Sequence, residues 1–287
     1  MLICTKKLSY TYMPGTSFKV EALREIDLSI DRGSFTVLLG PSGSGKSTLL
    51  QLLGGLLRPT EGAIFIDGRR LQYRRRELRE LRRRVGLVFQ EPERQFFCET
   101  LYDEIAFAPR NFALPPGTVK ERVEQALQQV GLDDPALLQR SPFQLSAGQQ
   151  RLAAIAAVLA MQPRLLLLDE PTAGLDQAGQ RKLFALLQQL NRRPGFTVVV
   201  VTHRLDRVAS LADYYLVLDR GGLLMEGSPG EIFSRAEELH RCGLSLPPVM
   251  LLMHELIAAG LPFSPVLYSI EEARREINAW RKKVARP

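Results

Sequence analysis

The most constraining feature of the sequence is a glycine-rich stretch at residues 40–47 that is typical of a phosphate-binding loop. It fits the pattern G-x-x-x-x-G-K-[ST] at every fixed position. The apolar run at 35–39 is expected to be a buried strand, and a helix is expected to begin after the loop. Strand, loop and helix in this order are the context that the pattern requires. The stretch therefore predicts a site that binds a nucleoside triphosphate.

The residue types of this loop suit the binding of phosphate groups. Glycines allow main-chain N–H groups to turn toward an anion, and the helix N-terminus adds partial positive charge. We expect Lys46 to reach the β- and γ-phosphates and the hydroxyl of Ser47 to hold Mg²⁺. The predicted nucleotide-binding segment comprises Gly40, Pro41, Ser42, Gly43, Ser44, Gly45, Lys46, Ser47 and Thr48. The alternative is an ordinary glycine- and serine-rich turn that contains a lysine by chance.

Polar side chains follow three further apolar runs, each of which is expected to be a buried strand. The runs are 85–89, 165–168 and 198–201. The polar residues that follow them are Gln90, Asp169, Glu170 and His203. In an open parallel sheet with helices on both faces, ligands bind at the carboxyl ends of the strands. We therefore expect these side chains to converge on the phosphate-binding loop.

These side chains suit the hydrolysis of a nucleoside triphosphate. Asp169 fits the carboxylate that positions Mg²⁺, and Glu170 can orient and deprotonate the attacking water. The amide of Gln90 can contact Mg²⁺ and the same water, and His203 can donate to a γ-phosphate oxygen. The alternatives are that the two acids only favour a helix N-terminus, and that the histidine is an ordinary satisfied polar residue.

Two further segments bear on the class of enzyme. Residues 145–149 read Leu-Ser-Ala-Gly-Gln and precede a buried helix of small residues at 152–160, with Ser146 at its N-terminus. Tyr12 lies beside a predicted turn at 13–16 and either packs against its neighbours or stacks on a nucleotide base. A phosphate-binding loop alone does not require residues 145–149, so they narrow the class of enzyme.

The net charge of +7 comes from one segment of an otherwise balanced chain. Nine arginines and two glutamates lie between Arg69 and Arg84. Leu78, Leu81 and Val85 fall on one side of a short predicted helix, so the arginines occupy its other side. The segment is a solvated helical face or a contact with anionic lipid headgroups or an acidic partner. Nucleic acid is not expected, because aromatic residues do not alternate with the arginines.

The sequence favours a cytosolic protein. No apolar run approaches the roughly 18 residues that span a bilayer, and the polar N-terminal stretch is not a signal peptide. The three cysteines are widely spaced and form neither a zinc pattern nor an expected disulfide framework.

The full set of motifs resembles that of ABC-type ATPases in order and spacing, over about residues 1–235. The set comprises the phosphate-binding loop, Gln90, residues 145–149 (the signature motif of that family), 165–170, 173–176 and His203. The chain is most similar to ATP-binding subunits of energy-coupling factor (ECF) transporters, because residues 8–22, 90–96 and 106–112 also resemble that group. The resemblance implies an α/β fold. Its parts are a P-loop NTPase core with a mostly parallel sheet, an N-terminal antiparallel β part, a helical subdomain that carries the signature motif, and a small helical C-terminal tail.

The resemblance also implies how such an ATPase works. Two ATPase subunits, identical or different, would face each other and enclose two ATP molecules with Mg²⁺. The signature residues that contact the nucleotide of the opposite subunit would be Ser146, Ala147, Gly148 and Gln149. Tyr12 would stack on adenine, and Asp176 would couple the two sites across the interface.

The resemblance further implies partners and a location. The ATPase pair would bind a transmembrane scaffold subunit and a substrate-binding membrane subunit at the cytoplasmic face of the cell membrane. It would drive the uptake of a vitamin or a metal ion. Two alternatives are a soluble ABC-type ATPase that is not attached to a transporter and a P-loop kinase of a small molecule. The former typically carries a long coiled-coil insertion or a second ATPase core, and the latter needs neither the signature motif nor Glu170.

One residue departs from the family pattern. The third residue of the signature motif is usually glycine, and here it is Ala147. A Cβ at this position costs about 1–2 kcal/mol if φ must be positive. The departure therefore puts the full strength of the contact with the opposite subunit in doubt.

The C-terminal tail, residues 244–287, is predicted to be a separate helical segment. A helix is expected at 249–259, and a linker with Pro262 and Pro265 follows it. A second helix is expected to begin at a capping box of Ser269 and Glu272 and to reach Trp280. The resemblance implies that this tail helps two subunits associate, and packing on its own domain is the alternative.

The segment after Gln90 mixes charged and aromatic residues. Glu91, Glu93 and Arg94 are followed by Phe96 and Phe97. The mixture predicts a groove that receives a short helix of a membrane partner, with apolar anchors and a charged rim. Packing of both phenylalanines within their own domain is the alternative. Charge reversal at the two glutamates is expected to uncouple transport and to spare basal ATP hydrolysis.

Overall fold

Two β-sheets form the centre of the structure, a computed structural model that describes residues 1–203, 205–209, 211–264, 267 and 269–284. One has the strand order β10-β9-β3-β8-β7-β6, and the other β2-β1-β4-β5. The first comprises β3 (Phe35–Leu39), β6 (Val85–Val88), β7 (Leu165–Asp169), β8 (Thr197–Val201), β9 (Tyr214–Asp219) and β10 (Gly222–Gly227). The second comprises β1 (Ile3–Tyr12), β2 (Val20–Ile30), β4 (Glu61–Ile66) and β5 (Arg69–Arg70).

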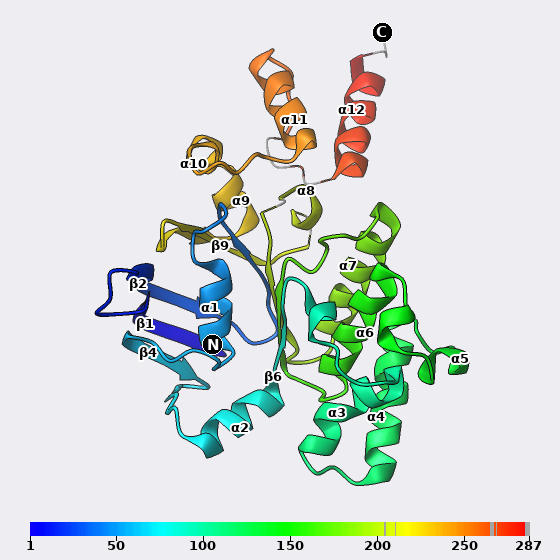
Figure 1. Cartoon of the computed structure of the whole chain (residues 1–287). Helices are drawn as coiled ribbons and strands as arrows, with labels where there is room; N and C mark the ends of the chain where they lie inside the picture. Colours follow the sequence, from blue (N-terminus) through cyan, green and yellow to red (C-terminus); the bar gives the residue numbers. More distant parts are fainter. Residues whose placement is uncertain (204, 210, 265–266, 268, 285–287) are drawn as a thin grey trace.

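Helices lie on both sides of the six-stranded sheet (Figure 1). Those that precede the signature motif are α1 (Lys46–Leu53), α2 (Arg75–Arg84), α3 (Leu101–Asn111), α4 (Pro116–Val130) and α5 (Pro135–Leu138). Those that follow are α6 (Ala147–Leu159), α7 (Gln177–Asn191), α8 (Leu205–Val208), α9 (Pro229–Phe233), α10 (Ala236–Arg241), α11 (Pro248–Ala258) and α12 (Ile270–Val284). Short 3₁₀ turns lie at η1 (Pro92–Gln95) and η2 (Pro142–Gln144).

The six-stranded sheet is mostly parallel, as predicted. Strands β6, β7, β8, β3 and β9 are parallel to their neighbours, and β10 pairs antiparallel with β9. Alternate residues of the central strands enter two different cores: Leu166 of β7 faces one and Leu167 faces the other. Burial of both faces explains the continuous apolar runs of the sequence.

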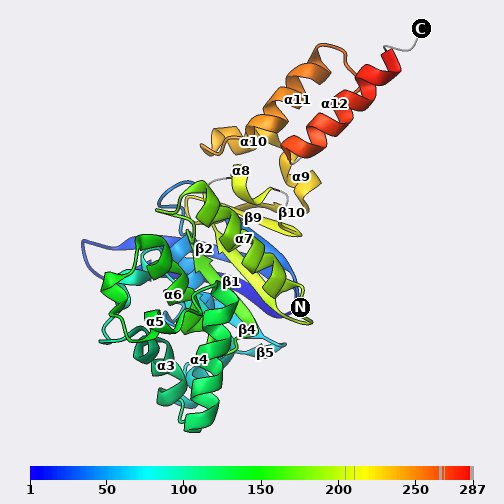
Figure 2. The ribbon, with the colours of Figure 1, turned by 90° about the vertical axis from the view of Figure 1, so that its right-hand side faces the viewer.

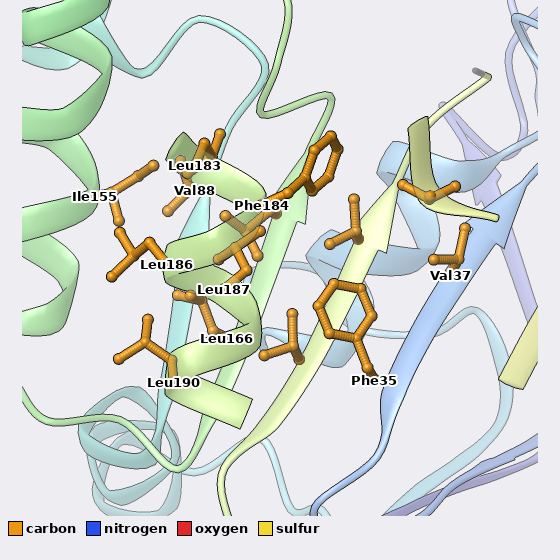
Figure 3. Close-up of a cluster of buried hydrophobic side chains, with 14 of the residues drawn as sticks. Phe35, Val37, Val88, Ile155, Leu166, Leu183, Phe184, Leu186, Leu187 and Leu190 are labelled. Carbon is orange, nitrogen blue, oxygen red and sulfur yellow. The ribbon is translucent and has the colours of Figure 1, made fainter. Parts of the chain in front are cut away.

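The two cores place the helices relative to the sheet. On one face, α7 packs on the strands through Leu183, Leu187 and Leu190, and Ile155 of α6 belongs to the same core (Figure 3). On the other face, α1 packs with the antiparallel sheet through its leucines, among them Leu49. The phosphate-binding loop and the signature helix are therefore held on opposite faces of one sheet. The predicted fold class, with its antiparallel N-terminal part and helical subdomain, is confirmed.

The tail forms a helical pair that projects from the body of the molecule (Figures 1 and 2). Helices α11 and α12 share a small buried cluster around Met253, in which the rings of Phe263 and Trp280 lie 5.6 Å apart. The predicted capping box is present, because the main-chain N–H of Ser269 donates to Glu272 at 3.1 Å and the reverse bond measures 3.2 Å. Pro265, half of the expected linker, lies outside the described residues.

The segment that joins the tail to the body packs on the body. The buried residues Leu239, Leu244, Leu246 and Met250 belong to the core of α6 and α7. The division into domains 1–235 and 244–287 remains a prediction. No helix in the described ranges is both long enough and apolar enough to cross a membrane.

Candidate nucleotide-binding site

The phosphate-binding loop connects β3 to α1, and glycine is required at two of its positions. The φ angle is 152° at Gly40 and 99° at Gly45, in the range that favours glycine. A Cβ on Gly45 would lie 2.6 Å from the main-chain oxygen of Ala22, and one on Gly40 would collide with that of Leu218. Gly45 is also the N-cap of α1, so no capping side chain stands between the first N–H groups and an anion.

Lys46 is buried within this loop. Its Nζ donates hydrogen bonds of 2.7 Å to the main-chain oxygens of Gly40 and Pro41. Burial lowers the pKa of the Lys46 ammonium, and the carboxylates of Glu170 and Asp169 oppose that decrease. The loop therefore holds a partly desolvated cation at the place where the sequence predicts phosphate groups.

Asp169 ends strand β7 and is buried beside the loop. Burial raises the pKa of its carboxyl group, while a hydrogen bond from the hydroxyl of Ser47 acts in the opposite direction. Mg²⁺ prefers such oxygen donors and usually binds through one or two protein groups together with phosphates and water. No cluster of three or more His, Cys, Asp or Glu residues in the described part of the chain could hold a metal by itself. The oxygens of Asp169 and Ser47 therefore fit a Mg²⁺ ion that also binds the phosphates of a nucleotide.

Glu170 is held in place by the end of the neighbouring strand β8. Its Oε1 accepts hydrogen bonds from the main-chain N–H of His203 at 2.9 Å and from Nδ1 of the same residue at 2.6 Å. Its Oε2 accepts one from the hydroxyl of Thr202 at 3.2 Å. The φ angle of Glu170 is 44°, a left-handed conformation that is uncommon for a side chain of this kind and typical of functional sites.

The structure thus brings together most of the residues that the strand-end pattern singled out. Lys46, Ser47, Asp169, Glu170 and His203 meet at the carboxyl edge of the parallel sheet. The ring of His203 is exposed and contacts the Glu170 carboxylate. Its predicted contact with a γ-phosphate remains a prediction.

Tyr12 lies beside the phosphate-binding loop, where an adenine-stacking residue is expected. Its hydroxyl is 3.1 Å from the hydroxyl of Thr48 on α1, and its ring packs edge-on against Tyr10 at 4.8 Å. A substantial part of the side chain, 36%, stays exposed. The ring therefore has a free face close to α1.

The signature motif forms the N-terminus of α6, as predicted. Ser146 is the N-cap: its hydroxyl accepts from the N–H of Gln149 at 3.3 Å, and Oε1 of Gln149 accepts from the N–H of Ser146 at 3.0 Å. Ala147 is the first residue of the helix, and its φ is not positive. The expected cost of a Cβ at this position therefore does not arise, because only a positive φ would produce it.

Asp176 precedes α7 and caps it. Its Oδ1 accepts a hydrogen bond of 2.7 Å from the N–H of Gly179. The residue is exposed, so a partner subunit can approach it. Its predicted role in coupling two sites remains a prediction.

Arg151 is a residue of the site that the sequence analysis did not identify. It lies on α6 and is 4% exposed. Its Nη1 donates to the main-chain oxygen of Gln90 at 2.6 Å, and its Nη2 donates to the main-chain oxygen of Ala173 at 3.1 Å. Nη2 also lies 3.4 Å from Oε1 of Glu93. The sequence did contain a clue to its role, because Arg151 is a charged residue that directly precedes the apolar run of the signature helix.

The segment after Gln90 is only partly as expected. Phe96 is buried in the core of its own domain and packs edge-on against Phe143, so it is not an anchor for a partner. Phe97 is 61% exposed and packs against the half-exposed Phe107 of α3, with ring centres 4.7 Å apart. A groove of about 160 Å³ lies beside this pair.

The expectation for charge reversal at Glu93 needs correction. Glu93 is the acid nearest to the buried guanidinium of Arg151. A lysine there would place a second cation against that group, so basal ATP hydrolysis would not be spared. Phe97 and Phe107 are better positions at which to test coupling.

Comparison with known proteins identifies the family. The model of the ABC transporter family matches residues 23–173. The chain is 47% identical to the energy-coupling factor transporter ATP-binding protein EcfA2 of Symbiobacterium thermophilum, over 100% of both proteins. It is also 47% identical to the EcfA2 protein of Latilactobacillus sakei, over 93% of this chain and 92% of that protein.

Solved structures agree with this assignment. The structure of cbiO1 from Clostridium perfringens, part of the ABC transporter complex cbiONQ, matches with a TM-score of 0.74 and 36% identity over 88% of this chain and 98% of that one. The dimeric ATP-binding cassette MJ0796 bound to ADP and Pi matches with a TM-score of 0.71 and 33% identity, over 79% and 99%. The chain is therefore an ATPase that belongs to the ABC transporter family and, within it, to the ATP-binding proteins of energy-coupling factor transporters.

Proposed function

We propose that this ATPase is the motor subunit of an ECF-type importer and works as one half of a pair of ATPase subunits. Two subunits face each other, and each ATP lies between the phosphate-binding loop of one and the signature motif of the other. The position of the two motifs on opposite faces of the sheet carries this proposal, because residues 146–149 lie on a different layer from α1. The dimeric state of the similar cassette MJ0796 supports it.

ATP binding uses the loop, α1 and Tyr12. The main-chain N–H groups at the start of α1 and the ammonium of Lys46 bind the phosphates, and the free face of Tyr12 stacks on adenine. Ser47, Asp169 and the amide of Gln90 would hold Mg²⁺, which would neutralise charge on the phosphates. Lys46 exchanges its two carbonyl partners for phosphate oxygens in this step.

Hydrolysis follows from the position of Glu170. Its carboxylate orients a water for in-line attack on the γ-phosphorus and accepts a proton from it, so that ATP and water yield ADP and phosphate. Hydrogen bonds from Thr202 and His203 fix the carboxylate, which lowers the entropy lost when the water is positioned. Gln90 contacts the same water. The neutral ring of His203 carries one N–H, so it donates either to Glu170 or, when ATP is bound, to a γ-phosphate oxygen.

Membrane partners complete the transporter. The exposed pair Phe97 and Phe107, with the groove beside it, receives a short helix of a transmembrane scaffold subunit, and a second membrane subunit binds the substrate. The chain then sits at the cytoplasmic face of the cell membrane as a peripheral subunit, and the substrate is a vitamin or a metal ion. The tail helices contribute to association of the two ATPase subunits.

The test separates this proposal from the alternative of a soluble ATPase without a transporter. Tagged protein is purified from detergent-solubilised membranes of its native host, and its ATPase activity and associated integral membrane proteins are measured. We expect the chain to co-purify with a scaffold subunit and a substrate-binding subunit, and to release free phosphate. Recovery of the chain from the soluble fraction without membrane subunits would favour the alternative, and transfer of phosphate to a small molecule would indicate a kinase.

A further inference from the structure

A groove on the surface between β5 and α2 has five arginines among the eleven residues that line it. It has a volume of about 590 Å³, and the arginines that line it are Arg69, Arg70, Arg74, Arg76 and Arg84. We call it the arginine groove. All five side chains are exposed. The function proposed above makes no use of this segment, although it accounts for the net charge of the chain.

The charge of the arginine groove is only partly compensated within the described part of the chain: Arg84 lies 3.9 Å from Asp67, and Glu77 and Glu80 line the groove. Side chains in that part of the chain form no ion pair or hydrogen bond with the guanidinium groups of Arg69, Arg70, Arg74 and Arg76. The two acids that line the groove have other contacts. Glu77 accepts from the main-chain N–H of Gln72 at 3.1 Å, and Glu80 lies 3.7 Å from Arg83. Like charges held this closely repel one another, so an anionic ligand would relieve the repulsion.

The N-terminus of α2 adds positive potential at the same place. Arg74 is its N-cap and Arg75 and Arg76 are its first two residues, and Glu77 is the acid of the first turn. Arg74 also offers no acceptor to the first main-chain N–H groups of the helix. Unbonded N–H groups beside guanidinium groups form a site that favours phosphate oxygens.

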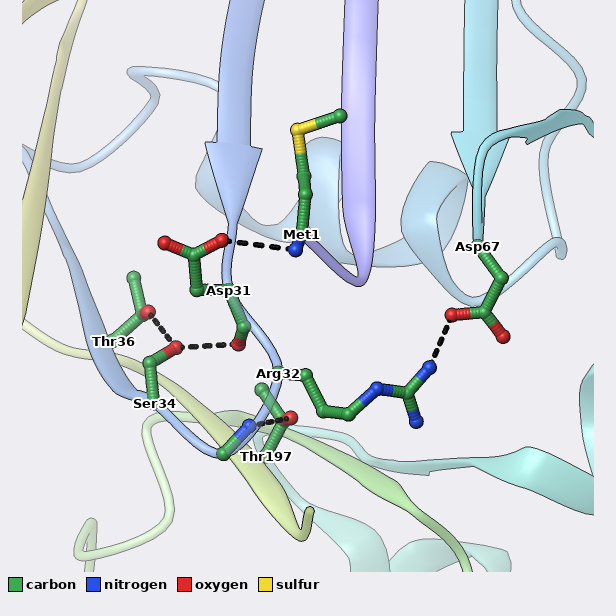
Figure 4. Close-up of polar contacts among 8 residues, drawn as sticks. Met1, Asp31, Arg32, Ser34, Thr36, Asp67 and Thr197 are labelled. Atoms are coloured by element: carbon green, nitrogen blue, oxygen red, sulfur yellow. Dashed lines mark hydrogen bonds and ion pairs between the residues drawn. The ribbon is translucent and has the colours of Figure 1, made fainter.

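The basic surface continues along the amino ends of the parallel strands. A second groove of about 450 Å³ is lined by Arg32, Arg164 and Arg193, which precede β3, β7 and β8. Arg84 and Arg164 line a narrow cleft that joins the two grooves. Asp67 is the acid at this junction, and Figure 4 shows that Arg32 contacts it. The surface thus lies at the sheet edge opposite the nucleotide site, and α2 lies at the opposite end of the molecule from α11 and α12 (Figure 1).

We propose that the arginine groove binds phosphate groups of anionic phospholipids. Guanidinium forks bind phosphate oxygens in pairs, and a cluster of about four to eight basic residues on an amphipathic helix is typical of proteins that bind anionic membranes. The basic surface includes both grooves, and a membrane presents many phosphates side by side. The choice of lipid rests on the proposed location at the membrane.

The experiment measures co-sedimentation of the purified full-length protein with vesicles. Vesicles of phosphatidylcholine alone are compared with vesicles that also contain phosphatidylglycerol. We expect binding to the anionic vesicles only, and a decrease as salt is raised. The triple variant Arg70→Glu, Arg74→Glu, Arg76→Glu is expected to bind at least about tenfold more weakly. The triple variant with glutamine at the same positions should show a smaller loss and guards against misfolding of the first.

A matched control changes the net charge by the same amount elsewhere. The variant Lys19→Glu, Arg140→Glu, Lys182→Glu replaces exposed residues outside both basic grooves and should bind like the wild type. Equal loss in both triple variants, or no loss in the first, would overturn the proposal. So would stabilisation by inorganic phosphate without vesicle binding, or preference for an acidic peptide over vesicles. ATP hydrolysis by the same variants is measured without lipid and should match the wild type. A loss of vesicle binding can then be told apart from a failure of the proposed transporter function.

Discussion

The guanidinium of Arg151 donates a 2.6 Å hydrogen bond to the main-chain oxygen of Gln90, and so connects the signature helix to the residue that follows β6. The same group donates to the oxygen of Ala173, in the segment that leads from Glu170 to α7. One buried cation therefore links the signature helix, the segment after β6 and the segment after Glu170. If the proposed ATP-bound dimer closes, we expect Arg151 to transmit a movement of α6 to the other two segments.

Replacement of Arg151 by methionine is expected to slow ATP hydrolysis and to leave ATP binding nearly unchanged. The variant loses hydrogen bonds to two main-chain oxygens but none to the phosphate-binding loop. Loss of such bonds in a buried place costs about 1–3 kcal/mol each in stability. Measurement of kcat, of the dissociation constant for ATP and of the melting temperature separates the two effects. Arg122→Met is the matched control, because Arg122 also donates to main-chain oxygens near α6, at Ala160 and Met161. Equal effects of both variants on kcat would refute a positioning role for Arg151.

Glu170→Gln is expected to bind ATP and to hydrolyse it about 10²- to 10⁴-fold more slowly, because the amide cannot accept a proton from water. The amide oxygen can still accept the hydrogen bonds from His203, so the side chain should keep its position. Phosphate release in single-turnover experiments measures hydrolysis, and the mass of the ATP-bound complex shows that ATP is still bound. Glu124→Gln, at an exposed position of α4, should behave like the wild type. Phosphate release at a near-normal rate would rule out the general base.

Lys46→Ala is expected to weaken ATP binding by about 10- to 100-fold, because a charge-assisted hydrogen bond to phosphate is lost. Burial lowers the pKa of the ammonium, so its charge is fully present at low pH and disappears as pH rises through this lowered value. As pH rises, the affinity of the wild type for ATP should therefore begin to fall at a lower pH than it would if the lysine were exposed. The variant should lack this step, and the two affinities should converge at alkaline pH. The prediction would be contradicted if the wild-type affinity did not change between neutral pH and the ordinary pKa of a lysine.

The double variant Phe97→Ser, Phe107→Ser is expected to abolish transport in the assembled transporter while basal ATP hydrolysis stays within about twofold. The two rings form an exposed pair that packs edge-on. Loss of an apolar anchor of this size typically costs 1 kcal/mol or more at an interface, or roughly a fivefold or larger loss of affinity. Substrate uptake per ATP hydrolysed is the measurement, with Leu224→Ser on β10 as the control for an exposed apolar residue. Normal uptake per ATP in the double variant would place the coupling surface elsewhere.

The sequence alone determined the features that depend on residues close together in the chain. Continuous apolar runs predicted the buried strands, because both faces of β7 and β8 are covered and nearly every residue of these runs is apolar. The capping boxes at Ser146 and Ser269 could be read from residues three positions apart. The position of the polar strand ends followed from the rule for parallel sheets, so most of the nucleotide site was predictable.

The tertiary structure decided which residues of mixed segments are buried. Phe96 and Phe97 are neighbours in the chain, yet one enters the core and the other faces solvent. The 3₁₀ turn η1 ends at Gln95 and the backbone of Phe96 is extended, so successive side chains point in opposite directions. Only the fold revealed that Arg151 reaches Gln90 and Ala173, which are far from it in sequence. The conformation of Ala147 likewise depended on where α6 begins. Local patterns specify elements and their ends, whereas contacts between distant segments arise only when the sheet and helices pack, and these contacts decide which charges and rings remain available for function.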